Sequence, residues 1–207
     1  MTRWLADVGV PTYLLPEIPT LFIKSGFTFP GTAPEREAEL HAFESALFDI
    51  AVAFEDNASK VAAARAASGI RGPAGRPAYV IIHDRGLVDM AAYTPPEIWA
   101  SLLRARGFAH ADLLARYDHV IHLSSAALGA EQSYTLANNA ARTESPEHAR
   151  ALDAAVAAVY AEHAHRVVIA AERDFRVKLL AVERAMESIV GPRPMTSDAA
   201  AATSNLQ

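Results

Sequence analysis

The sequence predicts an α/β fold, a three-layer arrangement in which a parallel sheet is covered by helices on both faces. Short apolar segments alternate with longer amphipathic segments along the chain. The short segments are apolar on both faces, as expected of parallel strands buried between helices. No internal repeat or second domain is visible, so residues 1–191 are predicted to form one domain. Residues 192–207 are rich in Pro, Ala and Ser and lack periodicity, which predicts a disordered tail.

The first third of the chain is predicted to begin with a helix, a strand and a helix, each ended by a glycine or a proline: Thr2–Val8, Thr12–Leu15 and Ile18–Ser25. A loop then leads to one long helix, Glu35–Ser68. Apolar residues recur along it at three- and four-residue steps and their multiples, which predicts a single buried stripe. The stripe consists of Leu40, Phe43, Leu47, Ile50, Phe54 and Val61.

The remaining strands are predicted where β-type apolar residues cluster: Tyr79–His83, His119–Leu123 and Arg166–Ile169. The remaining helices are predicted at Glu97–Arg106, at Ala109–Arg116, from Pro146 to about His163 and at Phe175–Val190. Ser145 and Pro146 form a strong helix start, as N-cap and first helical residue. Trp4 and Trp99 are predicted to be packing residues.

The composition excludes several classes of protein. The net charge is −5 and the pI about 5.9, which argues against a general nucleic-acid binder. No run approaches the ~20 apolar residues of a membrane helix, so no membrane span is predicted. The absence of Cys rules out disulfides and thiolate metal sites and is consistent with the reducing cytoplasm, the predicted location. An oligomer is compatible with the sequence.

Two predicted strands end in carboxylates. Glu17 follows the strand of residues 12–15, and Asp84 with Arg85 follows that of residues 79–83. Ligands of open parallel sheets sit just beyond the carboxyl ends of the strands. Phosphoryl transfer needs acids there to orient the acceptor and to hold Mg²⁺, and a cation to contact phosphate. The sequence therefore predicts a phosphoryl-transfer site. The alternatives are a solvent-facing Glu17 and an Asp84 that caps a helix or pairs with its own Arg85.

A polar segment, residues 134–150, follows the predicted strand that ends at Leu123, and it contains Arg142 and Arg150. Arginines on a closing flap could clamp nucleotide phosphates and exclude water. The alternative is a surface loop that leads into a well-capped helix.

With these parts together, the chain resembles a family of AAA-type P-loop NTPases related to the nicotinamide riboside kinase part of the bacterial regulator NadR and to the GTP-binding protein of the TRP-channel translocation-defect type. The matching segments are LLPEIPTLFIKSGFTFPG at 14–31, VIIHDRGLVDMAAY at 80–93, RYDHVIHLSSAA at 116–127 and YTLANNAARTESPEHARALD at 134–153. The resemblance implies a kinase-like P-loop sheet. It assigns catalytic roles to Glu17, Asp84 and Arg85, with Asp84 toward Mg²⁺. It places Arg142 toward the phosphates, and Asp89 and Tyr93 on the acceptor side.

The chain departs from this family at its beginning. Members start with a strand, the glycine loop GxxxxGK[ST] and a helix, whereas no GK[ST] occurs in these 207 residues. The first predicted helix lies where the end of that family helix belongs. We therefore expect a domain truncated at its N-terminus, lacking the first central strand and the Walker A loop, with a true reading frame that starts upstream or a shortened chain. Nucleotide binding should then be impaired, because the glycine loop supplies most phosphate contacts.

The sequence thus favours an ATP- or GTP-binding protein, a kinase that acts with Mg²⁺ on a small, nucleoside-like acceptor. Two other functions stay open. One is a degenerate, non-enzymatic binding module, and the other is a nucleoside triphosphate hydrolase that works as a switch.

Overall fold

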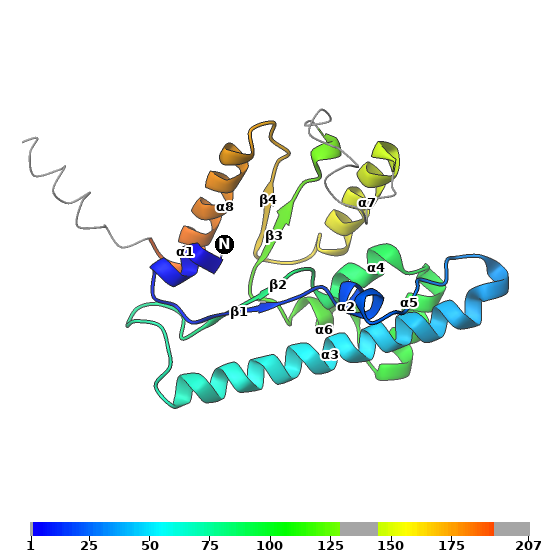
Figure 1. Ribbon diagram of the computed structural model, residues 1–207, viewed down its shortest axis with the longest axis horizontal. Coiled ribbons are helices and arrows are strands. Elements are labelled where there is room, and N and C mark those ends of the chain that lie inside the picture. Colours follow the sequence, from blue (N-terminus) through cyan, green and yellow to red (C-terminus); the bar gives the residue numbers. More distant parts are fainter. Residues whose placement is uncertain (1, 129–144, 193–207) are drawn as a thin grey trace, which may run out of the picture.

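The computed structural model of the protein describes residues 2–128 and 145–192 (Figure 1). The strands are β1 (Thr12–Leu15), β2 (Val80–His83), β3 (Val120–Leu123) and β4 (Arg166–Ile169). The α-helices are α1 (Thr2–Asp7), α2 (Ile18–Lys24), α3 (Glu37–Ala67), α4 (Met90–Tyr93), α5 (Pro96–Arg106), α6 (His110–Leu114), α7 (Pro146–Val159) and α8 (Phe175–Val190). Short 3-10 turns are η1 (Pro34–Arg36), η2 (Leu87–Asp89) and η3 (Ala126–Leu128). The α/β class is confirmed; the disordered tail predicted for 192–207 lies, from residue 193 on, outside the described residues.

The four strands form two parallel pairs. β1 lies beside β2 in a register that sets Leu15 opposite His83, and β3 lies beside β4 with Leu123 opposite Ile169. The parallel direction is as predicted. The sheet expected from the sequence lacks its first central strand. Within the described ranges, β2 and β3 are not hydrogen-bonded to each other, so the four strands form two two-stranded sheets.

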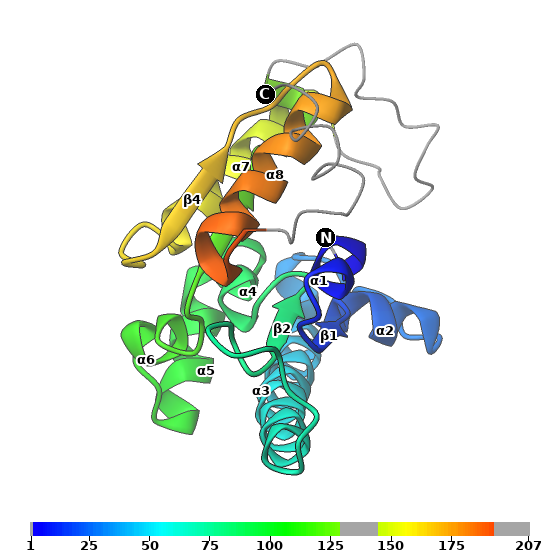
Figure 2. The same cartoon turned by 90° about the vertical axis from the view of Figure 1, so that its left-hand side faces the viewer.

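A cleft of about 1580 Å³ separates the two pairs, and every residue of β2 and β3 lines it. Figure 2 shows β1, β2 and α3 on one side, and α7, β4 and α8 on the other. In a parallel ladder, alternate residues of a strand face a given neighbour. Because the N–H groups of Val80 and Asp84 donate to the β1 side, those of Ile81 and His83 face the cleft.

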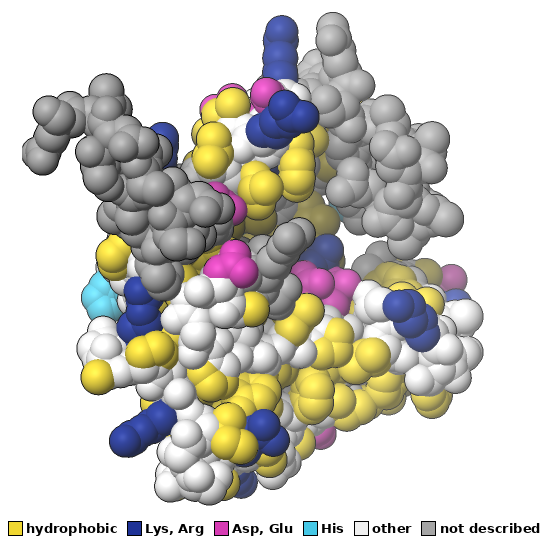
Figure 3. All heavy atoms as spheres, turned by 60° about the vertical axis from the view of Figure 1, so that its left-hand side comes forward, with side chains coloured by type: hydrophobic (Ala, Val, Ile, Leu, Met, Phe, Trp, Pro, Cys, Tyr) yellow, Lys and Arg dark blue, Asp and Glu magenta, His cyan; other side chains and the backbone are white. Residues whose placement is uncertain are grey.

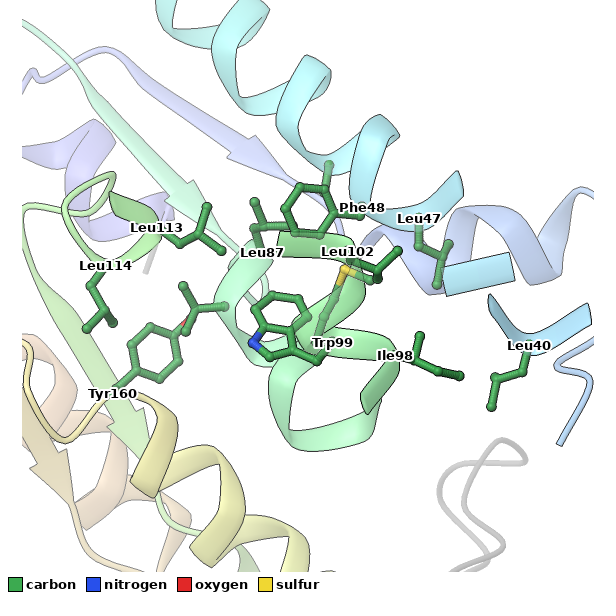
Figure 4. Close-up of a cluster of buried hydrophobic side chains, with 13 residues drawn as sticks. Leu40, Leu47, Phe48, Leu87, Ile98, Trp99, Leu102, Leu113, Leu114 and Tyr160 are labelled. Carbon is green, nitrogen blue, oxygen red and sulfur yellow. The ribbon is translucent and has the colours of Figure 1, made fainter. Parts of the chain in front are cut away.

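The apolar core forms two clusters. The larger cluster joins α3, α5, α6 and the η2–α4 segment, with Phe48 of α3 against Trp99 and near Leu87 (Figure 4). The second cluster joins α1, β4 and α8 around Trp4, and side chains of β2 and β3 pack onto it. Trp4 and Trp99 are 3% and 9% exposed, which confirms that both are packing residues.

The β4–α8 part keeps many apolar side chains at its surface. Val168, Phe175 and Leu180 are more than half exposed. Figure 3 shows hydrophobic side chains on the surface of this part. None of the helices in residues 2–128 and 145–192 is both long and apolar enough to cross a membrane.

The predicted stripe of α3 is right only in its first half. Leu40 and Leu47 are buried, but Ile50, Phe54 and Val61 are exposed. The buried face of the helix instead carries two glutamates besides its apolar residues: Leu40, Glu44, Leu47, Phe48, Ala51, Glu55 and Ala62. The two glutamates can be buried because neighbouring elements supply hydrogen-bond donors to them. The apolar residues on the adjacent face of the helix are exposed to solvent instead.

Several predicted boundaries also move. The long helix begins at Glu37 after the η1 turn, and α7 ends at Val159, four residues before the predicted end at His163. The chain leaves the helix there and directs the ring of Tyr160 into the larger cluster. The predicted helix start is confirmed, because the Ser145 hydroxyl accepts a hydrogen bond from the His148 N–H at 3.2 Å.

Candidate functional site

The carboxyl ends of β1 and β2 bring three of the predicted site residues to one edge. The register of the two strands is fixed by their apolar side chains, so the residues that follow them emerge together. Glu17 lies directly before α2, and its Oε1 is 3.0 Å from Nη1 of Arg85. The other carboxylate oxygen of Glu17 accepts a hydrogen bond from the Thr20 hydroxyl at 2.6 Å.

Arg85 is held from two sides. Besides the ion pair with Glu17, its Nη1 donates to the hydroxyl of Tyr93 at 2.5 Å, and the guanidinium carbon lies 5.0 Å from the centre of the Tyr93 ring. The Arg85 side chain is still 46% exposed. The structure therefore places a cation that is oriented by protein groups yet open to a ligand at this edge.

Asp84 lies beside this arrangement and lines the cleft. Its backbone N–H donates to the Leu15 carbonyl at 2.9 Å, which fixes the residue to the end of β1. The residue is exposed, and no hydrogen bond or ion pair to its carboxylate is found in the described part of the chain. This carboxylate is therefore available to a cation or a hydroxyl group.

The three residues Asp84–Gly86, here called the DRG turn, have an unusual backbone. Arg85 has φ of +65°, and it is the only residue other than glycine with positive φ among the described residues. A left-handed conformation costs roughly 1–2 kcal/mol for a residue with a side chain. Gly86 is enclosed as well, because a Cβ there would lie 2.7 Å from the Tyr117 ring and 2.9 Å from the Tyr160 hydroxyl.

Asp89, predicted on the acceptor side, is engaged within the fold. Its Oδ2 accepts hydrogen bonds from the Gly86 N–H at 2.7 Å and from the Tyr160 hydroxyl at 2.8 Å. Burial raises the pKa of Asp89 above its ordinary value, although these hydrogen bonds and nearby Arg85 favour the charged form. Asp89 thus connects the DRG turn to the end of α7.

Sequence reasoning missed a buried group beneath the turn. Glu55 of α3 accepts hydrogen bonds from Nε of Arg116 at 2.7 Å and from the Tyr117 hydroxyl at 2.9 Å. The same carboxylate is 3.4 Å from Nδ1 of His83 and 3.2 Å from the Leu87 nitrogen. Its position could have indicated this role, because Glu55 lies four residues after Ala51 on the buried face of the helix. A buried acid there needs hydrogen-bond partners.

The opposite wall of the cleft carries a second polar group that the sequence did not reveal. His122 of β3 is 3.4 Å from Oδ2 of Asp153, whose other oxygen accepts from the Ser125 N–H at 2.7 Å. Lys178 donates to the Ser124 carbonyl at 2.7 Å, and burial lowers its pKa. These groups surround the carboxyl end of β3, across the cleft from the DRG turn.

The two predicted flap arginines are placed differently. Arg142 lies outside the described residues. Arg150 is half-buried on α7, where Nη1 donates to the Ala127 carbonyl at 3.2 Å and Nη2 lies 3.3 Å from Glu147. Its guanidinium is thus tied to the segment before and the first turn of its own helix.

The site suits Mg²⁺ of the kind bound together with a nucleotide. Within residues 2–128 and 145–192, no group of three or more His, Cys, Asp or Glu side chains could hold a metal ion by itself. Mg²⁺ beside nucleotides usually takes one or two carboxylates and completes its shell with water and phosphate oxygens. The single unpartnered carboxylate of Asp84 fits that pattern.

The comparison with known families agrees with this geometry. A model of the AAA domain matches residues 1–177. No curated protein and no solved structure matches the chain. The match covers nearly all the described residues, both strand pairs and the DRG turn included. The chain therefore belongs to the AAA domain family of P-loop NTPases and is a nucleotide-binding protein.

Proposed function

We propose that this chain is a Mg²⁺-dependent phosphotransferase that transfers a phosphoryl group from ATP or GTP to a hydroxyl group of a small, nucleoside-like acceptor, in the manner of the NadR kinase part. The observation that carries the proposal is the pairing of an unpartnered carboxylate, Asp84, with an oriented cation, Arg85, at the edge of a deep cleft. A hydrolase needs no second substrate pocket, whereas this cleft extends well beyond the DRG turn.

We propose the following roles for these residues. Asp84 holds Mg²⁺ or orients the acceptor hydroxyl, and Arg85 contacts the acceptor or the transferred phosphoryl group. Glu17 and Tyr93 keep the Arg85 guanidinium in place and form the acceptor side with Asp89. Bound Mg²⁺ would neutralise phosphate charge during the transfer.

Arg142 and Arg150 are proposed to reach the nucleotide phosphates from the flap side. For Arg150 this requires that its contacts with Ala127 and Glu147 give way, because both hold the guanidinium at α7. A nucleotide phosphate offers a bidentate partner stronger than a carbonyl and a surface carboxylate.

We further infer that these 207 residues by themselves bind nucleotide weakly. They contain no GxxxxGK[ST] motif, and the backbone N–H groups of that loop supply most contacts to the phosphates. The proposal therefore predicts dissociation constants for Mg·ATP and Mg·GTP above the micromolar range.

The test combines calorimetry with product analysis. The chain is titrated with Mg·ATP and Mg·GTP, and phosphorylated products are then sought in a panel of nucleosides. Asp84→Ala should abolish Mg²⁺-dependent binding and transfer. Asp118→Ala, an exposed acid at the amino end of β3 on the same cleft, should leave both unchanged. Equal turnover in Asp84→Ala and the unmodified chain would reject the assignment. Release of inorganic phosphate without a phosphorylated acceptor would replace the kinase with a hydrolase.

A further inference from the structure

Glu55 contacts the chain on both sides of the DRG turn. Its Oε1 lies 3.4 Å from Nδ1 of His83, the last residue of β2, and 3.2 Å from the nitrogen of Leu87, the first residue of η2. The three residues between these contacts are the turn itself. One carboxylate thus holds both ends of the segment that carries Asp84 and Arg85.

The carboxylate is itself held rigidly. Its side chain is 8% exposed, Arg116 donates to Oε2 at 2.7 Å, and the Tyr117 hydroxyl donates to Oε1 at 2.9 Å. The same hydroxyl accepts from the Leu87 N–H at 2.7 Å, which closes a ring of hydrogen bonds under the turn. Burial opposes ionisation of Glu55, but hydrogen bonds from His83 and Arg116 outweigh it, so its pKa lies below the ordinary value. Glu55 is therefore an anion at neutral pH with every strong contact satisfied.

The turn needs such support because its backbone is strained. Left-handed residues with a side chain persist only where the surrounding structure determines them, and they occur most often at functional sites. Arg85 is such a residue, with φ of +65°. That conformation sends its side chain toward Glu17 and Tyr93 and leaves Asp84 on the cleft.

We infer that Glu55 is a positioning residue: it holds the DRG turn in its left-handed conformation and so sets where Asp84 and Arg85 present their charges. It touches neither nucleotide nor acceptor. Its importance for catalysis rests on the proposed function, whereas its effect on the turn does not.

Glu44 provides a matched control for the test. It is also a buried glutamate of α3, and Thr94 donates a hydrogen bond to it at 3.0 Å, but no hydrogen bond or ion pair joins it to residues 83–87 in the described part of the chain. Glu55→Gln and Glu44→Gln each replace one buried carboxyl group of the same helix by an amide with little change of shape. A general loss of stability would affect both variants, but only a positioning role would single out Glu55→Gln.

The decisive measurement is the backbone chemical shift of Arg85 in isotope-labelled protein, since these shifts report the sign of φ. In Glu55→Gln, the Arg85 shifts should leave the left-handed range, and the rate of Mg·ATP-dependent transfer should fall by about a hundredfold, as expected when reacting groups are misplaced by about 1 Å. In Glu44→Gln both should stay as in the unmodified chain. Unchanged Arg85 shifts in a folded Glu55→Gln variant would overturn the inference.

If Glu55→Gln does not fold, Glu55→Asp decides the question, because it keeps the charge but draws the carboxylate back from His83 and the Leu87 N–H by one methylene group. A change in the Arg85 shifts then supports the positioning role, and no change overturns it. If the unmodified chain binds no Mg·ATP at millimolar concentration, the proposed function fails, but the Arg85 shifts still decide whether Glu55 holds the turn.

Discussion

Replacing Gly86 with alanine tests how closely the DRG turn is enclosed. The backbone of Gly86 has φ of −89° and ψ of 167°, which any residue adopts, so no backbone strain is added. The new Cβ would instead lie 2.7 Å from the Tyr117 ring and 2.9 Å from the Tyr160 hydroxyl, closer than atoms approach without moving. Both rings would have to shift, and each hydroxyl is held by a carboxylate, Glu55 or Asp89.

The cost follows from these contacts. Overpacking of one methyl group typically destabilises by about 1–3 kcal/mol. The weakened hydrogen bonds of the two tyrosines add about 1 kcal/mol each. We therefore expect Gly86→Ala to lower the free energy of unfolding by about 3–5 kcal/mol, a large part of the ~5–15 kcal/mol of an ordinary domain.

Urea unfolding followed by tryptophan fluorescence measures this cost, because Trp99 lies in the adjoining core. Gly75→Ala is the control: nothing lies within 4 Å of a Cβ there, but φ is +79°. It should cost only about 1–2 kcal/mol, the usual cost of a left-handed alanine. If Gly86→Ala costs no more than Gly75→Ala, the tyrosines do not enclose the turn as described.

Further predictions concern α3 and the strand edges. Burial raises the pKa of Glu44, so the folded protein holds the proton of this carboxyl group more tightly than the unfolded chain does. The stability that the protonated Glu44 contributes is therefore present in acid and is lost as the pH rises above 4.5. Over that range, the unfolding free energy of the unmodified chain minus that of Glu44→Gln should fall. Phe48→Ala should destabilise by about 3–5 kcal/mol, but Phe54→Ala, on a side chain that is 39% exposed, by only about 1–2 kcal/mol. Equal costs in denaturant titrations would mean that Phe54 is as buried as the predicted regular stripe requires. Ile121→Pro removes an N–H that faces the cleft and should be tolerated, whereas His122→Pro removes one that faces β4 and should unfold the pair, as circular dichroism would show.

The order and type of the elements were accessible from the sequence because apolar spacing reports them directly. All four strands and the helix start at Ser145 were predicted within a few residues. The exposed half of α3 was not, since a helix can bury Glu44 and Glu55 only when distant segments supply Thr94 and Arg116. Such partners are set by tertiary packing and leave no local signal.

The candidate site was accessible to a similar degree. Glu17, Asp84 and Arg85 could be predicted as site residues because they follow strands in the sequence, and the residues that follow parallel strands lie at one edge of the sheet. The left-handed backbone of Arg85 had no such signal: glycine normally marks positive φ, and here the glycine is the next residue. The separation of β2 from β3 was accessible only through the family resemblance, which places a further strand in the middle of the sheet.

The two strand edges that face the cleft give the protein an unusual pattern of hydrogen exchange. Along β2, the N–H groups of Val80 and Asp84 are paired with the β1 side, and those of Ile81 and His83 open onto the cleft. Neighbouring amides of this short strand should therefore exchange their hydrogens alternately slowly and fast. Buried strands normally exchange as a block, at the rate at which the sheet opens. Along β2, exchange rates that alternate every second residue would mark the strand edge that faces the cleft. A ligand that closes the cleft would slow the exposed amides and so remove this alternation.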